Sequence, residues 1–390
     1  MEMNYDMIYS FHMPTKVVHG FNAIIQVGKE AKLLGIKKAL VVTDAGVKGA
    51  GLIDNGLKSL ESAGIPAIVF SEVEEDPGTK TVAKGIDLLK AEGCNGVIVV
   101  GGGSPMCAGK GIALVATNGG SIADYEGSEK YKVPPLPVIG IPTTAGAGSE
   151  VSATFIITDE KRNYKMAIAG ARVFPNVAVL DPVLLLNIPF WPGVNAAMDA
   201  LSHAIGTCCT NDATPITDSL AMASIAIMMK HLVPSVLTQD LEAKNQQLIA
   251  SVMANMACGN AKLDLIHALS HPLGSYHMPH GLANGILIPY VMEFNLPVCQ
   301  DKFAQMAMGM GESDHGVNVT QLAQRAIDRV KRLFIDVGFP TKIPSDVVDK
   351  KEIPNMVKQA MTRPMAKFNR RKSTEKDLAE IYERAFEGWG

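Results

Sequence analysis

The alternation of short apolar runs with helical segments in the first half of this 390-residue chain is the feature that most limits its fold. Near-continuous apolar runs are typical of parallel strands that are covered on both faces. Such runs occur at residues 39–43, 67–71, 96–100 and 137–141. Helical patterns lie between them, for example at residues 51–63 and 79–92. This order predicts an α/β domain with a doubly wound, Rossmann-like parallel sheet.

The character of the chain changes after a Pro/Gly-rich junction at residues 187–193. Strand patterns nearly vanish beyond it, and long helices rich in Ala, Met and Leu follow. Thr214-Pro215 supplies one of these helices with a cap and a first-turn proline. A chain of this length is too long for one ordinary core. We therefore expect an α/β domain at residues 1–186 and an all-helical domain at residues 187–390.

Composition indicates a globular protein that acts on small molecules. Hydrophobic residues make up 47% of the chain and charged residues 19%, and the net charge is only −3. This balance gives no reason to expect nucleic-acid or membrane-surface partners. The start of the chain lacks the apolar core of a secretory signal, and the longest apolar stretch is about half of the ~20 residues of a membrane span. The six cysteines show no C-x-x-C spacing and are expected to be free thiols. We expect a cytoplasmic protein.

One carboxylate and several histidines are concentrated in two short windows of the second half. These side chains are Asp199, His203, His267, His271, His277 and His280. The first two are four residues apart, so one helix face directs both toward a single point. His267 and His271 repeat that spacing, and the Pro272/Gly274 break lets a loop bring His280 back.

A single D-x-x-x-H pair is weak evidence, because buried histidines are common in cores without a metal. Five histidines in two apolar windows are stronger evidence, since burying so many titratable rings without a metal or a hydrogen-bond network is costly. A carboxylate with several imidazoles is typical of sites for iron, zinc, nickel or cobalt. Such a metal polarises an oxygen-bearing substrate.

A glycine-rich loop follows the third predicted strand. Its residues are Gly101, Gly102, Gly103 and Ser104, and a helix is expected to begin at Pro105. Glycines let backbone N–H groups approach a phosphate, and the start of a helix favours an anion. The loop is not a G-x-G-x-x-G fingerprint, because Met106 replaces the third glycine, and Gly111 excludes a Walker A loop. A simple strand-to-helix turn is an equally good interpretation of this loop alone.

Two further segments lie at predicted strand ends, where open α/β sheets bind ligands. The loop P-T-T-A-G-A-G-S-E offers hydroxyl groups at Thr143, Thr144 and Ser149. Asp44 follows the first strand, near the expected ribose, where a carboxylate favours NAD over NADP. The alternative for Asp44 is a helix cap or a turn residue.

Taken together, these segments resemble the iron-containing (group III) metal-dependent alcohol dehydrogenases over essentially the whole chain. The matching motifs are V-T-D-A-G, G-G-G-S-P, P-T-T-A-G-A-G-S-E, M-D-A-L-S-H and H-A-L-S-H-P-L-G with P-H-G-x-A-N. The resemblance implies a dehydroquinate synthase-like architecture: a dinucleotide-binding domain, a helical domain, and a cleft between them for NAD(P) and one divalent ion.

The resemblance also implies roles for individual residues. The implied metal ligands are Asp199, His203, His267 and His280. His271 is then a candidate to relay a proton near the nicotinamide, and Asp44 would select NAD. The implied cofactor-binding residues are Gly101, Gly102, Gly103, Ser104, Lys110, Thr143, Thr144 and Ser149.

Three departures from the family pattern affect the expected site. Cys107 stands where the family usually has an aspartate, and the loop from His271 to His280 is one residue shorter, which affects His277. The usual N-P-R reads Asn369-Arg370-Arg371, so Arg370 replaces the proline and stands next to Arg371. Either these arginines form a solvated basic face, or a guanidinium pairs with an anionic substrate tail.

The expected function is an NAD(H)-dependent alcohol dehydrogenase or aldehyde reductase that uses one divalent metal, Fe²⁺ or Zn²⁺. Its substrate would be a small primary alcohol or aldehyde, including aldehydes with an anionic tail such as sulfoacetaldehyde. A metal- and NAD-dependent lyase of the dehydroquinate synthase type is an alternative, and so is a non-catalytic metal- or nucleotide-binding relative. The family suggests a homodimer or a larger homo-oligomer.

Overall fold

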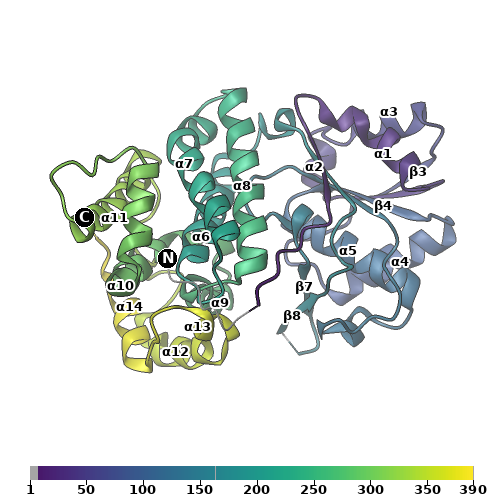
Figure 1. The fold of residues 1–390 in the computed structure, drawn as a ribbon. Coiled ribbons are helices and arrows are strands. Elements are labelled where there is room, and N and C mark those ends of the chain that lie inside the picture. Colours follow the sequence, from purple (N-terminus) through teal and green to yellow (C-terminus); the bar gives the residue numbers. More distant parts are fainter. Residues whose placement is uncertain (1–7, 163, 390) are drawn as a thin grey trace. The chain divides into compact units, whose positions relative to one another are not determined.

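The computed structural model describes residues 8–162 and 164–389, and this part of the chain separates into two compact units. One unit consists of Met13–Ile188. The other contains residues 189–389 together with residues 8–12. In Figure 1 the first unit carries the sheet and the second is built from helices. This division confirms the predicted class, an α/β half followed by a helical half.

The first unit is organised around a six-stranded parallel sheet with the order β1-β9-β6-β4-β2-β3 (Figure 1). The strands are β1 (Lys16–His19), β2 (Ala39–Val42), β3 (Ala67–Phe70), β4 (Gly96–Gly101), β6 (Val138–Pro142) and β9 (Val177–Leu180). Residues of β2, β4, β6 and β9 are buried throughout, which explains their continuous apolar sequence.

Helices connect consecutive strands of this sheet. They are α1 (Val27–Leu33), α2 (Ala45–Gly49), α3 (Asp54–Ser62), α4 (Thr79–Ala91) and α5 (Gly103–Asn118). Short 3-10 helices cover Ala23–Gln26, Ile122–Tyr125, Ser149–Val151 and Pro182–Leu185. The chain passes from β2 outward to β3 and then returns to β4 on the other side of β2. This reversal places the topological switch point, where such sheets bind ligands, between the carboxyl ends of β2 and β4.

A second, three-stranded sheet with the order β5-β8-β7 was not predicted. It comprises β5 (Gly127–Ser128), β7 (Thr154–Asp159) and β8 (Tyr164–Ala169), and β7 pairs antiparallel with β8. Only alternate residues of β8 are buried. Its sequence Y-K-M-A-I-A contains only one β-branched residue, Ile168, and so lacks the β-branched apolar run by which the main strands were recognised.

The second unit is entirely helical over its described residues. Its helices are α6 (Phe190–Cys208), α7 (Pro215–Leu237), α8 (Leu241–Ala261), α9 (Leu265–Gly274), α10 (His280–Gly309), α11 (Val319–Asp336), α12 (Ile353–Thr362), α13 (Pro364–Phe368) and α14 (Glu375–Glu387), with a 3-10 turn at Lys350–Glu352. Thr214 caps α7 and Pro215 occupies its first turn, as predicted. Cys299 departs from helical geometry two residues after Pro297, which kinks α10.

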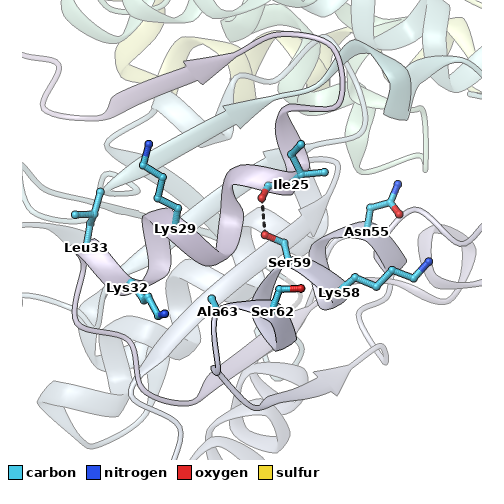
Figure 2. A pocket seen from close by; sticks show the side chains of 9 residues that line it. All are labelled: Ile25, Lys29, Lys32, Leu33, Asn55, Lys58, Ser59, Ser62 and Ala63. Carbon is cyan, nitrogen blue, oxygen red and sulfur yellow. Dashed lines mark hydrogen bonds between the residues drawn. The ribbon is translucent and has the colours of Figure 1, made fainter.

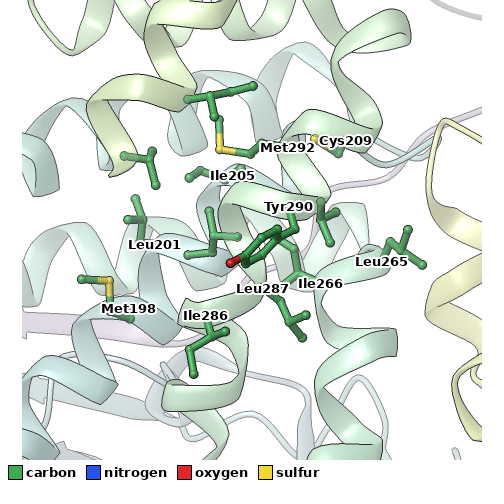
Figure 3. Close-up of a cluster of buried hydrophobic side chains, with 14 of the residues drawn as sticks. Met198, Leu201, Ile205, Cys209, Leu265, Ile266, Ile286, Leu287, Tyr290 and Met292 are labelled. Carbon is green, nitrogen blue, oxygen red and sulfur yellow. The ribbon is translucent and has the colours of Figure 1, made fainter. Parts of the chain in front are cut away.

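Apolar side chains of α6, α9 and α10 fix the relative positions of these three helices (Figure 3). Leu201 and Ile205 of α6, Ile266 of α9, and Ile286 and Leu287 of α10 are all fully buried. The same three helices carry the predicted metal ligands, so a packed core determines where those ligands meet.

Two helices of this unit, α7 and α10, have the length and mean hydropathy of a membrane span. Two-thirds of the apolar window of α10 is buried against other parts of the chain, and one-third of that of α7. Both helices pack in the helical core, and buried core helices have the same composition. They are therefore weak evidence for a membrane span.

Candidate functional site

Asp199 and His203 lie one turn apart on α6 and face the same point. Both side chains are buried, with 5% and 7% of the residue surface exposed. The distance from Asp199 Oδ1 to His203 Nε2 is 3.9 Å. The structure therefore confirms that the i, i+4 spacing brings these two groups together.

His267 on α9 and His280 at the start of α10 complete the cluster. Their Nε2 atoms lie 3.9 Å and 3.7 Å from Asp199 Oδ1. The His267 ring stacks on the His203 ring, with centroids 4.8 Å apart and planes inclined by 6°. One ligand atom each from Asp199, His267 and His280 falls within 4.8 Å of the others. Three helices thus direct a carboxylate and three imidazoles to one small volume.

Sequence reasoning missed Asn284, which lies at the centre of this cluster. Its Nδ2 is 2.7 Å from Asp199 Oδ1, 3.0 Å from His280 Nε2 and 3.2 Å from His267 Nε2. An amide group has two hydrogens and cannot satisfy three acceptors at once. The motif P-H-G-L-A-N could have predicted this position. Asn284 follows His280 by four residues, so both side chains lie on the same face of one helix.

The residues of this cluster fit a divalent metal ion. Desolvation, opposed by the charge of Asp199, lowers the pKa of His203. Desolvation and the neighbouring imidazoles lower the pKa of His267 strongly. Both rings are therefore neutral near pH 7 and keep a lone pair for coordination. One carboxylate oxygen with three imidazole nitrogens is a donor set that iron and zinc accept.

His271 lies in the last turn of α9, and His277 lies in the connection between α9 and α10. The half-buried His271 ring is 5.8 Å from the His280 ring, so it lies beside the cluster. His277 is exposed and has a left-handed φ of 59°. The helix α9 ends at Gly274, in agreement with the predicted Pro272/Gly274 break. The roles assigned to these two histidines stay predictions.

Arg370 and Arg371 both donate hydrogen bonds to backbone carbonyls of the helical unit. Arg370 Nε donates to the oxygen of Thr210, 3.1 Å away. Arg371 Nη1 donates to the oxygen of Phe294, and its guanidinium lies 4.1 Å from the centre of the Phe294 ring. These contacts attach the C-terminal segment to the helices beneath it. They do not decide between the two interpretations of the sequence, which are a solvated basic face and a guanidinium that binds an anionic substrate tail.

The glycine loop lies at the carboxyl end of β4, next to the switch point. Gly101 has a φ of 158°, and a Cβ there would lie 2.5 Å from a side-chain atom of Pro105. The helix α5 begins at Gly103, two residues before the predicted start at Pro105. The loop therefore combines a strained turn that needs glycine with the N-terminus of a 16-residue helix, which attracts anions.

The loop P-T-T-A-G-A-G-S-E, which follows β6, contacts the glycine loop. Thr143 N donates to the oxygen of Gly101 at 3.2 Å, and a Cβ on Gly102 would lie 3.4 Å from the Thr144 side chain. This proximity follows from the sheet, because β4 and β6 are neighbours. Ser104 Oγ accepts a hydrogen bond from the backbone N–H of Asp76, and Ser149 begins a short 3-10 helix. The two loops thus form one surface.

Asp44 and Lys110 have structural contacts that their predicted cofactor roles did not require. Asp44 Oδ1 accepts a hydrogen bond from Val47 N at 2.8 Å and caps α2, directly after β2. Lys110 is fully buried on α5, and its Nζ donates to the oxygen of Ser152 at 2.7 Å. Desolvation lowers the pKa of Lys110 to about 8. Their cofactor roles stay predictions.

A cavity of about 720 Å³ lies elsewhere in the first unit, between α1 and α3 (Figure 2). Lys29, Lys32 and Lys58 line it, and Ser59 Oγ donates to the oxygen of Ile25 at its wall. The cavity contains none of the predicted site residues. It is therefore not part of the candidate site.

Comparison with known proteins extends over both units. The family model described as iron-containing alcohol dehydrogenase matches residues 14–182, and that of the Fe-containing alcohol dehydrogenase family, C-terminal, matches residues 193–386. The chain belongs to the iron-containing alcohol dehydrogenase family. This membership confirms the resemblance drawn from the motifs, and it identifies the chain as an alcohol/aldehyde oxidoreductase of a family that uses NAD(H) and a divalent metal.

Characterised iron-containing alcohol dehydrogenases are similar to this chain over its whole length. The 1,3-propanediol dehydrogenase of Citrobacter freundii is 38% identical over 98% of this chain and 100% of its own length. The NAD-dependent methanol dehydrogenase of Bacillus methanolicus is 35% identical over 96% of this chain and 99% of its own. The crystal structure of a 1,3-propanediol oxidoreductase has a TM-score of 0.95 at 37% identity and covers 97% of this chain and 100% of that one.

Proposed function

We propose that this member of the family interconverts a small primary alcohol and its aldehyde by hydride transfer with NAD(H). The observation that carries the proposal is the group formed by Asp199, His267 and His280, with His203 Nε2 3.9 Å from Asp199 Oδ1 beside it. We assign the nucleotide to residues 1–186 and one divalent ion, Fe²⁺ or Zn²⁺, to residues 187–390. When bound, the metal would supply Lewis acidity at the substrate oxygen and the nicotinamide would donate or accept the hydride.

The chain's own residues would hold both reactants in place. Asp199, His203, His267 and His280 would hold the ion, and their burial on packed helices keeps them fixed. Backbone N–H groups at the start of α5 would bind the pyrophosphate, next to the hydroxyls of Thr143 and Thr144. The solved sulfoacetaldehyde reductase of Bifidobacterium kashiwanohense, 27% identical with a TM-score of 0.89, was crystallised with NAD⁺.

His271 would transfer the proton that accompanies oxidation of the alcohol. Its half-buried ring lies beside the cluster, with its centroid 5.8 Å from that of the His280 ring. A histidine in this position can take a proton from the reacting centre and pass it toward solvent. We therefore keep His271 as the general acid and base, and assign His277 no more than contact with substrate.

The substrate we propose is a small alcohol or aldehyde without a required charge. Relatives are named for 1,3-propanediol and methanol, and one solved neighbour for sulfoacetaldehyde. Arg370 and Arg371 already donate to backbone carbonyls, so each must have a further N–H available if it is also to bind an anionic tail. An anionic aldehyde is the second candidate, and the named reductase is what favours it.

We also infer the compartment and the oligomeric state of the enzyme. All six cysteines are free, which suits a reducing compartment, and we place the enzyme in the cytoplasm. We also propose a homodimer or a larger homo-oligomer. Light scattering on the purified protein tests this, and a monomeric mass at micromolar concentration would exclude it.

A panel of substrates with metal-stripped and reconstituted enzyme tests the proposal. NADH oxidation is measured with neutral aldehydes and with sulfoacetaldehyde and succinate semialdehyde, before and after addition of Fe²⁺ or Zn²⁺. We expect metal-dependent NADH consumption with at least one small aldehyde. Full activity in the stripped protein would exclude the metal assignment. Turnover without net change in NADH would indicate a lyase that regenerates its NAD.

A further inference from the structure

A second carboxylate, that of Asp264, is buried next to the metal-binding cluster. The residue has no exposed surface and immediately precedes α9, which it caps. Asp264 Oδ1 accepts a hydrogen bond from Ile266 N at 3.1 Å, and the backbone N–H of His267 also faces the carboxylate. Oδ2 has no hydrogen bond of ordinary geometry within the described residues. Capping of α9 therefore leaves Oδ2 of Asp264 without a hydrogen-bond partner in the part of the chain that the structure describes.

The carboxylate lies near an unsatisfied donor position on His267, which is closest to Oδ1, the oxygen that also accepts from Ile266 N. Asp264 Oδ1 is 3.8 Å from His267 Nδ1, and Nδ1 finds no partner in the described part of the chain. The other ring nitrogen, Nε2, points toward Asp199 and Asn284. An imidazole that coordinates through Nε2 carries its proton on Nδ1, where a carboxylate can accept it.

The neighbouring helix leaves room for this carboxylate. Gly206 of α6 follows His203 by three residues, and a Cβ there would lie 2.6 Å from Asp264 Oδ1 and 2.8 Å from its Cγ. Gly206 lies in the last turn of α6, where alanine would be the better helix former, so the glycine needs a reason. The gap at Gly206 admits the carboxylate between α6 and α9, the two helices that carry three of the four proposed ligands.

We propose that Asp264 is a positioning residue that holds His267 through Nδ1–H, so that the Nε2 lone pair faces the metal site. The inference rests on the proposed function, because it assumes that His267 is a ligand. The distance of 3.8 Å exceeds a hydrogen bond, so the proposal requires the carboxylate or the ring to rotate until the two atoms approach more closely. Carboxylates that orient metal-bound histidines in this way raise metal affinity.

Two substitutions test the contact by different routes. Asp264→Asn keeps one oxygen for the helix cap but removes the charge and the second acceptor. Gly206→Ala leaves the carboxylate unchanged and displaces it by adding a methyl group. Each has a matched control in the same unit: Asp240→Asn alters the cap of α8, where Asp240 accepts from Ala243 N, and Gly259→Ala adds a methyl group in open space.

The measurement is Co²⁺ and Zn²⁺ affinity of the stripped protein, determined by competition with a chelator, together with the visible Co²⁺ spectrum. We expect Asp264→Asn to weaken metal binding about 10- to 100-fold and to shift the Co²⁺ bands. Gly206→Ala should act in the same direction, and both controls should match the wild type. Melting temperatures of the metal-free proteins measure separately how far each substitution weakens the cap of α9. If Asp264→Asn does not fold, Gly206→Ala still tests the contact.

The outcomes separate the inference from the function on which it rests. A wild type that binds no metal overturns both. A wild type that binds metal, with unchanged affinity and spectra in Asp264→Asn and Gly206→Ala, overturns the inference alone and leaves Asp264 as a helix cap.

Discussion

The loops at the carboxyl ends of the sheet and the histidine cluster of the helical unit offer binding groups of opposite kinds. The loops offer mainly backbone N–H groups, made accessible by Gly101, Gly102 and Gly103. The cluster offers side chains fixed by a packed core. Backbone sites tolerate many side-chain changes but no added Cβ, whereas side-chain sites fail when one ligand is lost. Substitutions can test this contrast directly.

The largest effect should follow from His267→Ala. His267 is 1% exposed and lies between two other imidazoles, so water cannot easily replace its nitrogen. We expect metal content to fall from one ion per chain to none, and kcat/KM to fall by more than about 1000-fold. The measurements are metal analysis and NADH oxidation.

His280→Ala should weaken metal binding less than His267→Ala, because 49% of the His280 side chain is exposed and water can enter. His315→Ala, in an exposed loop, is the control and should behave as the wild type. A His267→Ala protein that retains one ion per chain would contradict the proposed ligand set.

His271→Ala distinguishes holding the metal from moving a proton. Because His271 lies beside the cluster, we expect the metal content of the variant to equal that of the wild type. Loss of general acid–base catalysis should lower kcat about 100-fold and flatten its dependence on pH. Stopped-flow measurement of the hydride step across pH checks this. Loss of metal together with activity would instead make His271 a ligand.

Gly101→Ala tests the backbone site in isolation. The φ of 158° and the clash with Pro105 make alanine strained at this position, and the start of α5 must move to relieve it. We expect the KM for NAD(H) to rise about 10-fold while the metal stays bound, since the loss of one or two backbone contacts costs about 1–2 kcal/mol.

The control for Gly101→Ala is Gly49→Ala on α2, where no atom would lie within 4 Å of the new methyl group. Gly49→Ala should change neither the KM for NAD(H) nor the metal content. Metal loss in Gly101→Ala with normal NAD(H) binding would contradict the separation of the two sites.

The sequence predicted those parts of the site that depend on local geometry. The spacing of Asp199 and His203, or of His267 and His271, determines their helix face without knowledge of the fold. The strand ends likewise located Asp44 and the glycine loop, because all six strands of the main sheet run parallel.

Contacts that depend on how helices pack against one another were not predicted. Asn284 meets three ligands from three helices, and Asp264 fits against His267 only because Gly206 on another helix leaves space. The β7–β8 hairpin was missed for a related reason, since one face of β8 is exposed. The order of apolar residues along the chain does not predict which distant segments pack against one another.

An effect no larger than that of Gly101→Ala is expected for the choice between NAD and NADP, which tests whether the Asp44 side chain matters at the nucleotide site. Asp44 caps α2 through one oxygen, so Asp44→Gly removes the cap and the charge together, whereas Asp44→Ser keeps a capping oxygen and removes only the charge. If the carboxylate repels a 2′-phosphate, both variants should raise the ratio of kcat/KM for NADP to that for NAD by about 10-fold, equal to about 1.4 kcal/mol. Asp44→Gly alone should also lower the melting temperature, because it loses the cap. Unchanged cofactor preference in both variants would leave Asp44 as a helix cap without a role in selecting NAD.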